Sequence, residues 1–215
     1  MSTNKEVFDE IAESWYRFRH RSRFTRELEE MATRWRQGKL LNVGCAHGPD
    51  FIPFKDNFEL WGADFSEQML KLAQKYAAKF DFRVKLALAD ATSLPYPDNT
   101  FDCAIAVAIY HNIRGDKQRQ KAFQELKRVL KPGGEAFITV WNKWQPRFWL
   151  KGKEVNVPWK SGRNIYYRYY YLYSYPELCS LLTRTGFEIV RVFPEKSYRF
   201  RLKFFSRNIC ALIKK

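Results

Sequence analysis

The sequence predicts an α/β fold of the Rossmann-like, doubly wound type, in which a seven-stranded, mostly parallel sheet carries helices on both faces. Short apolar runs alternate with amphipathic runs of helical period along most of the 215 residues. A loop of small residues, 44–48, directly follows the apolar run 40–43. Twenty positions after Gly44, Asp64 closes the next apolar run. A strand, a tight loop and a second strand ending in a carboxylate are typical of a nucleoside-binding βαβ unit.

Each predicted element rests on a local pattern. Ser66 marks the start of one helix, because an apolar face of helical period follows it. A second helix, lined by Phe123 and Leu126, must end before Pro132, which cannot continue it. The other predicted helices cover residues 7–17, 25–36 and 176–185, and the strands cover 40–43, 60–63, 84–88, 103–107, 135–140, 187–193 and 208–213.

The length fits a single domain that covers residues 1–215. Residues 1–38 form an N-terminal helical segment ahead of the first predicted strand. Residues 141–175 do not fit the alternation of strands and helices. We therefore expect them to be an insertion on the substrate side of the active site.

Several classes of protein are disfavoured. No apolar run reaches the ~18 residues that span a bilayer, and no signal-peptide pattern opens the chain. We therefore expect a cytoplasmic protein without a membrane partner. Four cysteines, Cys45, Cys103, Cys179 and Cys210, are scattered without C-x-x-C spacing. They predict reduced, mostly buried thiols and no metal site.

The positive charge is concentrated at one end of the chain. Residues 141–215 carry 16 Lys and Arg against four Asp and Glu, a net charge of +12 out of +15 for the whole protein. A basic field of this kind attracts a polyanion and speeds its association. The alternative is a basic surface without a specific partner. Because the charge lies in the segment expected to set substrate specificity, we favour a nucleic-acid substrate.

Three further motifs follow the nucleoside-binding unit in order. Asp90-Ala91 follows the third predicted strand, residues 94–102 lead into the fourth, and residues 130–134 precede the fifth. With these motifs, residues 7–140 resemble the class I S-adenosylmethionine-dependent methyltransferases. In that family the last two strands form a terminal hairpin with one antiparallel strand. An NAD-dependent dehydrogenase is disfavoured, because the loop lacks the third-glycine spacing and the later motifs do not fit.

The resemblance implies S-adenosylmethionine as the cofactor. The glycine loop would hold the methionine moiety, Asp64 the ribose and Asp90 the adenine amine. Two positions depart from the family pattern, since Asn42 replaces the usual acidic residue and Ala46 the usual middle glycine. The cofactor-binding residues implied by the resemblance are Tyr16, Arg19, Gly44, Cys45, Ala46, Gly48, Asp64, Phe65, Asp90, Ala91 and Ala106.

A narrower resemblance extends into the last third. Segments 106–111, 133–141, 157–159 and 168–173 together resemble the tRNA wobble-uridine 5-carboxymethyl methyltransferases. Those enzymes esterify a carboxylate on the wobble uridine of the anticodon loop, and they work with a small zinc-binding activator subunit. Their paired histidines correspond to His111 and Asn112, so the second histidine is absent here. The resemblance implies tRNA as the substrate and such a subunit as a partner.

A carboxylate acceptor would suit these residues chemically. Because a carboxylate is already ionised at pH 7, its methylation needs no general base. Arg168, with Arg19 or Arg21, would orient the anion, and His111 would shape the pocket or hydrogen-bond the acceptor. His111 and Arg168 are therefore the predicted catalytic residues. The alternative for His111 is a loop histidine that is hydrogen-bonded to the backbone.

The tyrosine-rich segment 166–173 holds six tyrosines in eight residues. It predicts either a surface that stacks on unpaired bases or an aromatic hairpin packed on the core. Interleaved arginines favour single-stranded RNA over a duplex, since no module that reads a duplex groove is present. The predicted RNA contacts are Trp159, Arg163, Tyr169, Lys151 and Lys153.

Two other functions stay open. A small-molecule methyltransferase of the ubiquinone-biosynthesis type shares every core motif. A catalytically silent fold that binds RNA or a partner would fit the departures at Asn42 and Ala46.

The activator subunit would pair with residues 82–88, which lie at the sheet edge in this fold family. The alternative is an ordinary edge that Arg83 and Lys85 protect.

Overall fold

The computed structural model describes residues 3–199 and 202–215. Its main sheet consists of β1 (Gly38–Val43), β2 (Phe58–Asp64), β3 (Val84–Leu88), β4 (Phe101–Val107), β5 (Leu130–Trp141), β8 (Glu188–Pro194) and β9 (Asn208–Lys214). The strand order is β3-β2-β1-β4-β5-β9-β8. The first five strands in this order are parallel, and β9 is antiparallel to both β5 and β8. The predicted doubly wound fold with a terminal hairpin is confirmed.

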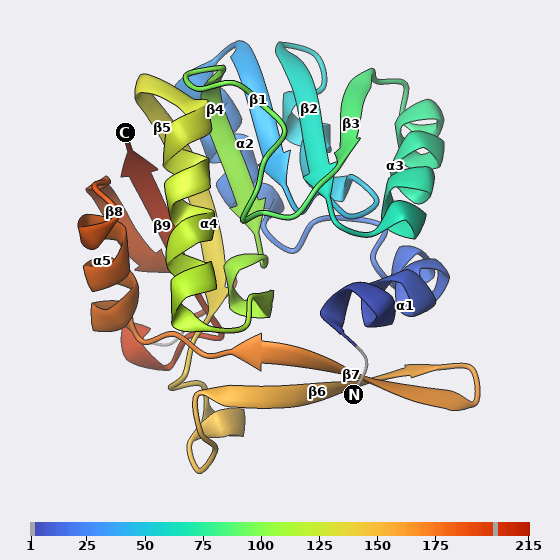
Figure 1. Ribbon diagram of the computed structural model, residues 1–215, viewed down its shortest axis with the longest axis vertical. Helices are drawn as coiled ribbons and strands as arrows, with labels where there is room; N and C mark the ends of the chain where they lie inside the picture. Colours follow the sequence, from blue (N-terminus) through green and yellow to red (C-terminus); the bar gives the residue numbers. More distant parts are fainter. Residues whose placement is uncertain (1–2, 200–201) are drawn as a thin grey trace.

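Helices cover both faces of this sheet (Figure 1). They are α1 (Asn4–Phe18), α2 (Thr25–Trp35), α3 (Glu67–Lys79), α4 (Asp116–Val129) and α5 (Tyr175–Arg184), with short 3₁₀ turns η1 (Pro49–Phe54), η2 (Tyr110–Asn112), η3 (Pro146–Phe148) and η4 (Lys203–Phe205). α4 and α5 bury Phe123 and Leu181 in one apolar cluster with the sheet. α2 and η1 bury Leu28 and Phe51 in a second cluster on the opposite face. The sheet is therefore buried between two layers, and its strand ends stay accessible.

Local capping starts α3 where the sequence predicts, whereas α1 begins at Asn4 and not at the predicted residue 7. The Ser66 side chain accepts a hydrogen bond from the Met69 backbone at 3.1 Å, as expected for the N-cap of α3. α1 begins with a capping box in which Thr3 and Glu6 satisfy each other's backbone N–H groups. These caps orient α3 and α1, which pack against each other beside the end of β2.

β5 is longer than predicted. The sequence places its start after Pro132-Gly133-Gly134, whereas the strand begins at Leu130, which pairs with Phe101 before a bulge. Gly133 has a φ of +78°, which suits a residue without a side chain. The chain end secures this stretch, because the Gly133 N–H donates to the Lys215 carbonyl at 3.0 Å and the Lys215 N–H donates to Gly134 at 2.9 Å. The Pro-Gly-Gly segment therefore bends the strand without ending it.

Residues 154–171 form a separate antiparallel hairpin of β6 (Glu154–Ser161) and β7 (Asn164–Tyr171). α1 lies between this hairpin and the strand ends of the main sheet (Figure 1). Asn4 connects α1 to η2 and to the hairpin, because its side-chain amide donates to the carbonyls of Asn112 at 2.9 Å and Tyr169 at 3.0 Å. The Tyr169 N–H donates back to the Asn4 side chain at 2.9 Å. The segment 141–175 thus covers the strand ends, where the sequence places an insertion.

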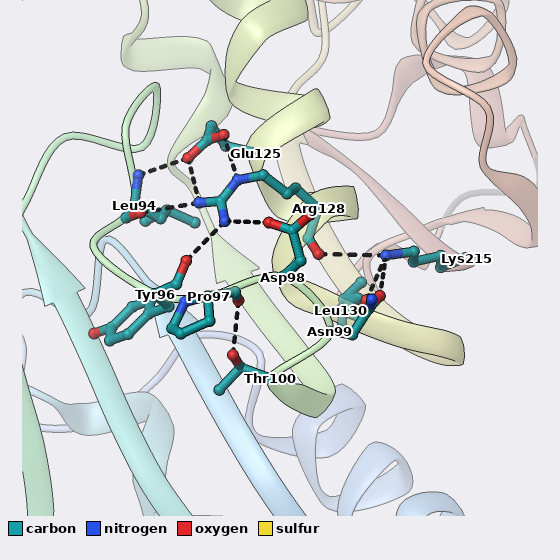
Figure 2. A network of polar contacts seen from close by, with 10 residues as sticks. All are labelled: Leu94, Tyr96, Pro97, Asp98, Asn99, Thr100, Glu125, Arg128, Leu130 and Lys215. Carbon is teal, nitrogen blue, oxygen red and sulfur yellow. Dashed lines mark hydrogen bonds and ion pairs between the residues drawn. The ribbon is translucent and has the colours of Figure 1, made fainter.

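Arg128 on α4 fixes the loop that leads into β4 (Figure 2). Its guanidinium donates to the carbonyls of Tyr96 at 2.7 Å and Leu94 at 3.0 Å, and it pairs with Glu125 and Asp98 at 2.8 Å each. These carboxylates raise the Arg128 pKa above its ordinary value. Charge-assisted hydrogen bonds of this kind are about twice as strong as neutral ones. The loop therefore holds a fixed path between β3 and β4.

The cysteines behave as expected from their spacing. Cys45, Cys103 and Cys210 are buried free thiols, and Cys179 is partly exposed. Burial raises the pKa of all four thiols. Within residues 3–199 and 202–215, none of the helices has both the length and the apolar character needed to cross a lipid bilayer.

Candidate active site

Two cavities open at the carboxyl ends of β1, β2 and β4, beneath α1 and the β6–β7 hairpin. The first cavity has a volume of about 610 Å³ and the second about 350 Å³. The residues that line both are Gly44, Asp64, Phe65, Ile109 and Asn112. A ligand in the first cavity would therefore meet a ligand in the second above the end of β1.

The loop after β1 is shaped by backbone geometry. Gly44 has a φ of +67°, and a Cβ added there would lie 1.8 Å from the Ile109 Cδ1 atom. No other residue fits this position without displacing Ile109. Ala46 also lies in the left-handed region, with a φ of +46°, although it is not glycine. The loop therefore keeps its tight turn despite the alanine, and it brings the backbone close to both cavities.

Asp64 connects this loop to α3. Its carboxylate accepts hydrogen bonds from the Ala46 N–H at 2.8 Å and the Ser66 N–H at 2.9 Å. The side chain is buried, and burial raises its pKa to about 6. A carboxylate has about four acceptor positions, so lone pairs remain for a ligand in the cavities that Asp64 lines. Asp64 thus lies between the loop and both cavities, and its contact with the ribose stays a prediction.

Asp90 and Ala91 line the far part of the first cavity, together with Phe65. One oxygen of Asp90 accepts hydrogen bonds from the Thr92 N–H at 2.8 Å and the Thr92 hydroxyl at 2.7 Å. This pairing fixes the carboxylate at the cavity wall. The three residues therefore line one cavity, and their contact with a cofactor stays a prediction.

The second cavity contains one buried and one half-buried guanidinium group, those of Arg168 and Arg19. Arg168 on β7 is 5% exposed and lies over the rings of Trp15 at 5.3 Å and Trp159 at 4.9 Å. Arg19, which follows α1, lies over the same Trp15 ring at 5.0 Å. Burial lowers the pKa of both arginines, and each feels the repulsion of a neighbouring arginine. The Nε atoms of both are buried and have no hydrogen-bond partner among the described residues.

Carboxylates are outnumbered in the second cavity. Asp50 and Asp64 line it, against five arginines: Arg19, Arg21, Arg23, Arg147 and Arg168. Burial raises the pKa of Asp50 to about 6, as it does for Asp64. Among the described residues, neither carboxylate forms an ion pair with Arg19 or Arg168. The second cavity is therefore electropositive and suited to an anionic ligand.

His111 lies between the rings of Tyr170 and Trp141, at centroid distances of 4.8 and 5.7 Å. Its Nδ1 atom accepts a hydrogen bond from the Trp141 N–H at 3.3 Å, so the ring proton resides on Nε2. Burial, followed by repulsion from Arg168, lowers the His111 pKa to about 3. The imidazole is therefore neutral at physiological pH, and it can donate a hydrogen bond but is a weak base.

Four of the implied cofactor residues line neither cavity. Cys45 and Ala106 are buried in the sheet core at 1% and 0% exposure, because their side chains point away from the strand ends. Tyr16 packs edge-on against His47 at 5.2 Å, and Gly48 precedes η1. For these four residues, cofactor binding stays a prediction that the cavity linings do not support.

The predicted RNA contacts have different environments. Tyr169 is 6% exposed and lies under the Arg114 guanidinium at 4.1 Å, so its ring offers no open stacking surface. Trp159 lines the second cavity and donates to the Ser14 hydroxyl at 2.8 Å. The prediction of an exposed stacking site is therefore wrong for Tyr169, because the β6–β7 hairpin packs this ring inward.

The basic residues among the predicted RNA contacts lie at the surface. Arg163 is exposed next to the hairpin turn at Gly162, and Lys151 is exposed ahead of β6. Lys153 is also exposed, but it forms an ion pair with Glu177 at 3.2 Å. Arg163 and Lys151 are therefore more readily available to an external anion than Lys153.

Sequence reasoning missed several residues of the site. Asn4, Ile109, Trp141, Arg147 and Tyr170 line the cavities, and none was singled out. Trp141 and Arg147 belong to the inserted segment, whose mix of aromatic and basic residues was the available signal. The sequence does not identify Asn4 as a site residue, since a lone asparagine at a helix start usually serves as a cap.

Within the two described stretches, no group of three or more His, Cys, Asp and Glu side chains is arranged to hold a metal ion.

Comparisons with known proteins agree with this geometry. A family profile described as a methyltransferase domain matches residues 40–134. This region contains the glycine loop, Asp64 and Asp90. A solved S-adenosylmethionine-dependent methyltransferase from Clostridium acetobutylicum superimposes with a TM-score of 0.76 at 15% identity, over 96% of this chain and 98% of that one.

Residues 40–134 thus match a methyltransferase domain, in a chain that has the fold of the class I S-adenosylmethionine-dependent methyltransferases.

Two relatives of the methyltransferase differ in the substrates that their names state. A tRNA (carboxymethyluridine(34)-5-O)-methyltransferase of Arabidopsis thaliana is 34% identical over 102 residues, which are 47% of this chain and 24% of the plant protein. The chain thus spans about a quarter of the length of that relative. A demethylmenaquinone methyltransferase of Thermus thermophilus is 29% identical over 181 residues, which are 83% of this chain and 74% of that protein.

The first cavity of the methyltransferase fits S-adenosylmethionine, its cofactor. Gly44 brings the loop backbone to the cavity wall, and Asp64 and Asp90 offer acceptors at two separate points of that wall. Below the loop, Asn42 is fully buried, and neither polar atom of its side chain has a hydrogen-bond partner among the described residues. An amide with unused hydrogen-bonding capacity beside the loop is consistent with a polar ligand or water bound there.

We expect Asp64→Ala to weaken S-adenosylmethionine binding about 10- to 150-fold, or ~1.5–3 kcal/mol, because the ribose hydroxyls lose a charged acceptor. For the wild type, affinity should fall as the pH drops through about 6, where Asp64 becomes protonated. Isothermal titration calorimetry measures both effects. Asp56→Ala, at an exposed carboxylate outside both cavities, is the matched control. An unchanged dissociation constant for Asp64→Ala would remove this residue from the site.

Proposed function

We propose that the methyltransferase esterifies the carboxylate of a 5-carboxymethyl group on the wobble uridine of tRNA. The observation that carries this proposal is a pair of guanidinium groups, the buried Arg168 and the half-buried Arg19, whose Nε atoms lack a described partner in a cavity that adjoins the cofactor site. Buried charges without a partner are costly, and a substrate carboxylate would supply the partner. A neutral acceptor would leave both cations uncompensated.

The residues of the chain would act by positioning the acceptor. When bound, S-adenosylmethionine supplies an electrophilic methyl group on a sulfonium sulfur. Arg168 and Arg19 would hold the carboxylate at the junction of the two cavities, which Gly44 and Asp64 mark. A carboxylate oxygen forms the new bond to the methyl carbon while the bond from carbon to sulfur breaks, and no proton is transferred. Holding two reactants in line can remove ~7–11 kcal/mol of barrier.

His111 supports a reaction without a general base. Its Nδ1 lone pair is engaged by the Trp141 N–H, and its pKa lies near 3. A residue with this pKa cannot efficiently take a proton from a hydroxyl or amine at neutral pH. Its Nε2 proton can instead donate a hydrogen bond to an acceptor oxygen. These properties match an acceptor that is already an anion.

The proposal of a tRNA substrate rests on the net charge of the chain and on its sequence similarity to a tRNA methyltransferase. The last third of the chain carries most of the net positive charge, which favours a polyanion. The name of the Arabidopsis relative states a tRNA activity, although the match covers a small part of that protein. A tRNA substrate would also place the reaction in the cytoplasm.

A small-molecule substrate is the second candidate. The Thermus relative matches most of this chain, and its name states a demethylmenaquinone methyltransferase. Aromatic residues such as Trp15 and Trp159 could pack against a ring. The guanidinium pair argues against this candidate, because a neutral ring would not compensate Arg19 and Arg168.

We also propose a small zinc-binding partner subunit at β3. This strand lies at the edge of the sheet, where one side of its backbone can pair with another chain. Leu88, at its end, is 55% exposed. Lys85 pairs with Glu59 at 2.6 Å, and these charged side chains partly shield the strand edge from pairing with other chains.

The substrate is tested by incubating the purified protein with S-adenosylmethionine and tRNA that carries 5-carboxymethyluridine at the wobble position. We expect mass spectrometry of the nucleosides to show the methyl ester. The same tRNA with unmodified uridine is the control. Methylation of a quinone precursor but not of tRNA would support the second candidate instead. Full activity of the isolated, monodisperse chain would contradict an obligatory partner subunit.

The chemical step is tested by single-turnover rates at saturating cofactor. We expect the rate to stay flat above about pH 6, because a carboxylate acceptor is ionised there. His111→Asn should lose less than about tenfold, whereas Arg168→Ala should lose about 10- to 150-fold, since a charged hydrogen bond to the acceptor is removed. Arg184→Ala, at an exposed position on α5, is the control.

A hydroxyl or amine acceptor gives the opposite result. The rate would then rise with an inflection typical of a general base, and His111→Asn would lose about 10²–10⁴-fold. An inflection that disappears in the His111 variant would contradict the carboxylate mechanism.

A further inference from the structure

A third cavity continues from the second one across the surface. It has a volume of about 1250 Å³ and lies between residues 145–149 on one side and residues 195–199 and 202–208 on the other. Trp141, Arg147, Asn208 and Arg23 line both this cavity and the second one. The third cavity is therefore an open extension of the acceptor site. Its volume exceeds the ~300–1,000 Å³ of ordinary small-molecule sites, which suits part of a polymer.

The third cavity presents cations and aromatic rings together. We name it the arginine groove after the residues that define its character: Arg23, Arg147, Arg199, Arg207, Trp149 and Phe205. All four arginines are exposed, and among the described residues none of them forms an ion pair. The only described carboxylate in its lining is Glu195, which is buried and accepts a hydrogen bond from Asn208. The groove is therefore strongly positive.

The aromatic rings of the groove are held in place rather than loose. Trp149 is 52% exposed, yet its Nε1 atom donates to the Trp144 carbonyl at 2.7 Å, and its ring lies 5.5 Å from that of Phe205. A half-exposed, pre-oriented indole next to guanidinium groups is suited to stack on an unpaired base. An aliphatic or protein ligand would not require four cations in the same groove.

We propose that the arginine groove binds the single-stranded nucleotides next to the methylated one. The arginines would contact their phosphates, and Trp149 would stack on one base. This inference rests on the proposed tRNA function and extends it, because it assigns the flanking nucleotides to a defined surface. The continuity of the groove with the second cavity lets one strand place its reactive nucleotide beside Arg168 while its neighbours lie along the groove.

The test measures binding of a fluorescent anticodon stem-loop RNA to the full chain at several salt concentrations. We expect Arg199→Gln/Arg207→Gln to reduce the slope of log affinity against log salt by about 1.4, at ~0.7 per phosphate contact to a single strand. Trp149→Ala should weaken binding at least about fivefold through lost stacking. S-adenosylmethionine affinity should not change in either variant, which shows that they are folded.

Lys117→Gln/Lys121→Gln is the matched control, because it removes two exposed charges from α4 outside the groove. This variant should keep the salt slope of the wild type. If the wild type binds and methylates tRNA but the groove variants match the control, the groove inference fails and the proposed function stands. If the wild type does not bind the RNA at all, the proposed function fails. If the groove variants lose only the complex with a partner protein, the groove is a protein interface, and the inference is overturned.

Discussion

The organisation of the site depends on two cations that share one aromatic ring, the buried Arg168 and the half-buried Arg19. Arg19 and Arg168 both lie over Trp15, at 5.0 and 5.3 Å from its centroid. Contacts between a cation and an aromatic ring contribute ~0.5–2 kcal/mol each, which is less than the cost of burying a charge. The chain thus keeps two positive charges that its own side chains compensate only in part. An anionic ligand would supply the compensation that is missing, although Asp50 and Asp64 also line the cavity.

The site is assembled from distant parts of the chain. Arg19 and Trp15 come from the N-terminal segment, Arg168 comes from the inserted hairpin, and the cofactor loop comes from the sheet. These parts are joined by the hydrogen bonds of Asn4, by those from Trp159 to Ser14 and from Ser66 to Asp9, and by the contact of the Trp15 and Trp159 rings. The second cavity therefore exists only while α1 is docked between the sheet and the hairpin. A substrate anion would strengthen this docking, because it would bridge Arg19 on one side and Arg168 on the other.

The sequence predicts the parts of the molecule that follow from local spacing. Strand periodicity and the small-residue loop place Asp64 and Asp90 at the strand ends, where the structure has them. Side-chain direction was less predictable. Cys45 belongs to the loop but points into the core, and Tyr169 is covered by Arg114, which is distant in sequence. The neutral state of His111 depends on the Trp141 N–H and on Arg168, neither of which a single sequence places beside it.

The central claim is that the second cavity recognises a negative charge. It is tested most directly by comparing two ligands, 5-carboxymethyluridine and its uncharged amide, 5-carbamoylmethyluridine. Their affinities would be measured by calorimetry with the protein saturated with S-adenosylhomocysteine. Because the acid gains charged hydrogen bonds that the amide cannot make, we predict that it binds at least about tenfold more tightly. Equal affinity for the two ligands would show that Arg19 and Arg168 do not distinguish a charged ligand from a neutral one. This result would contradict the claim that the second cavity recognises a negative charge.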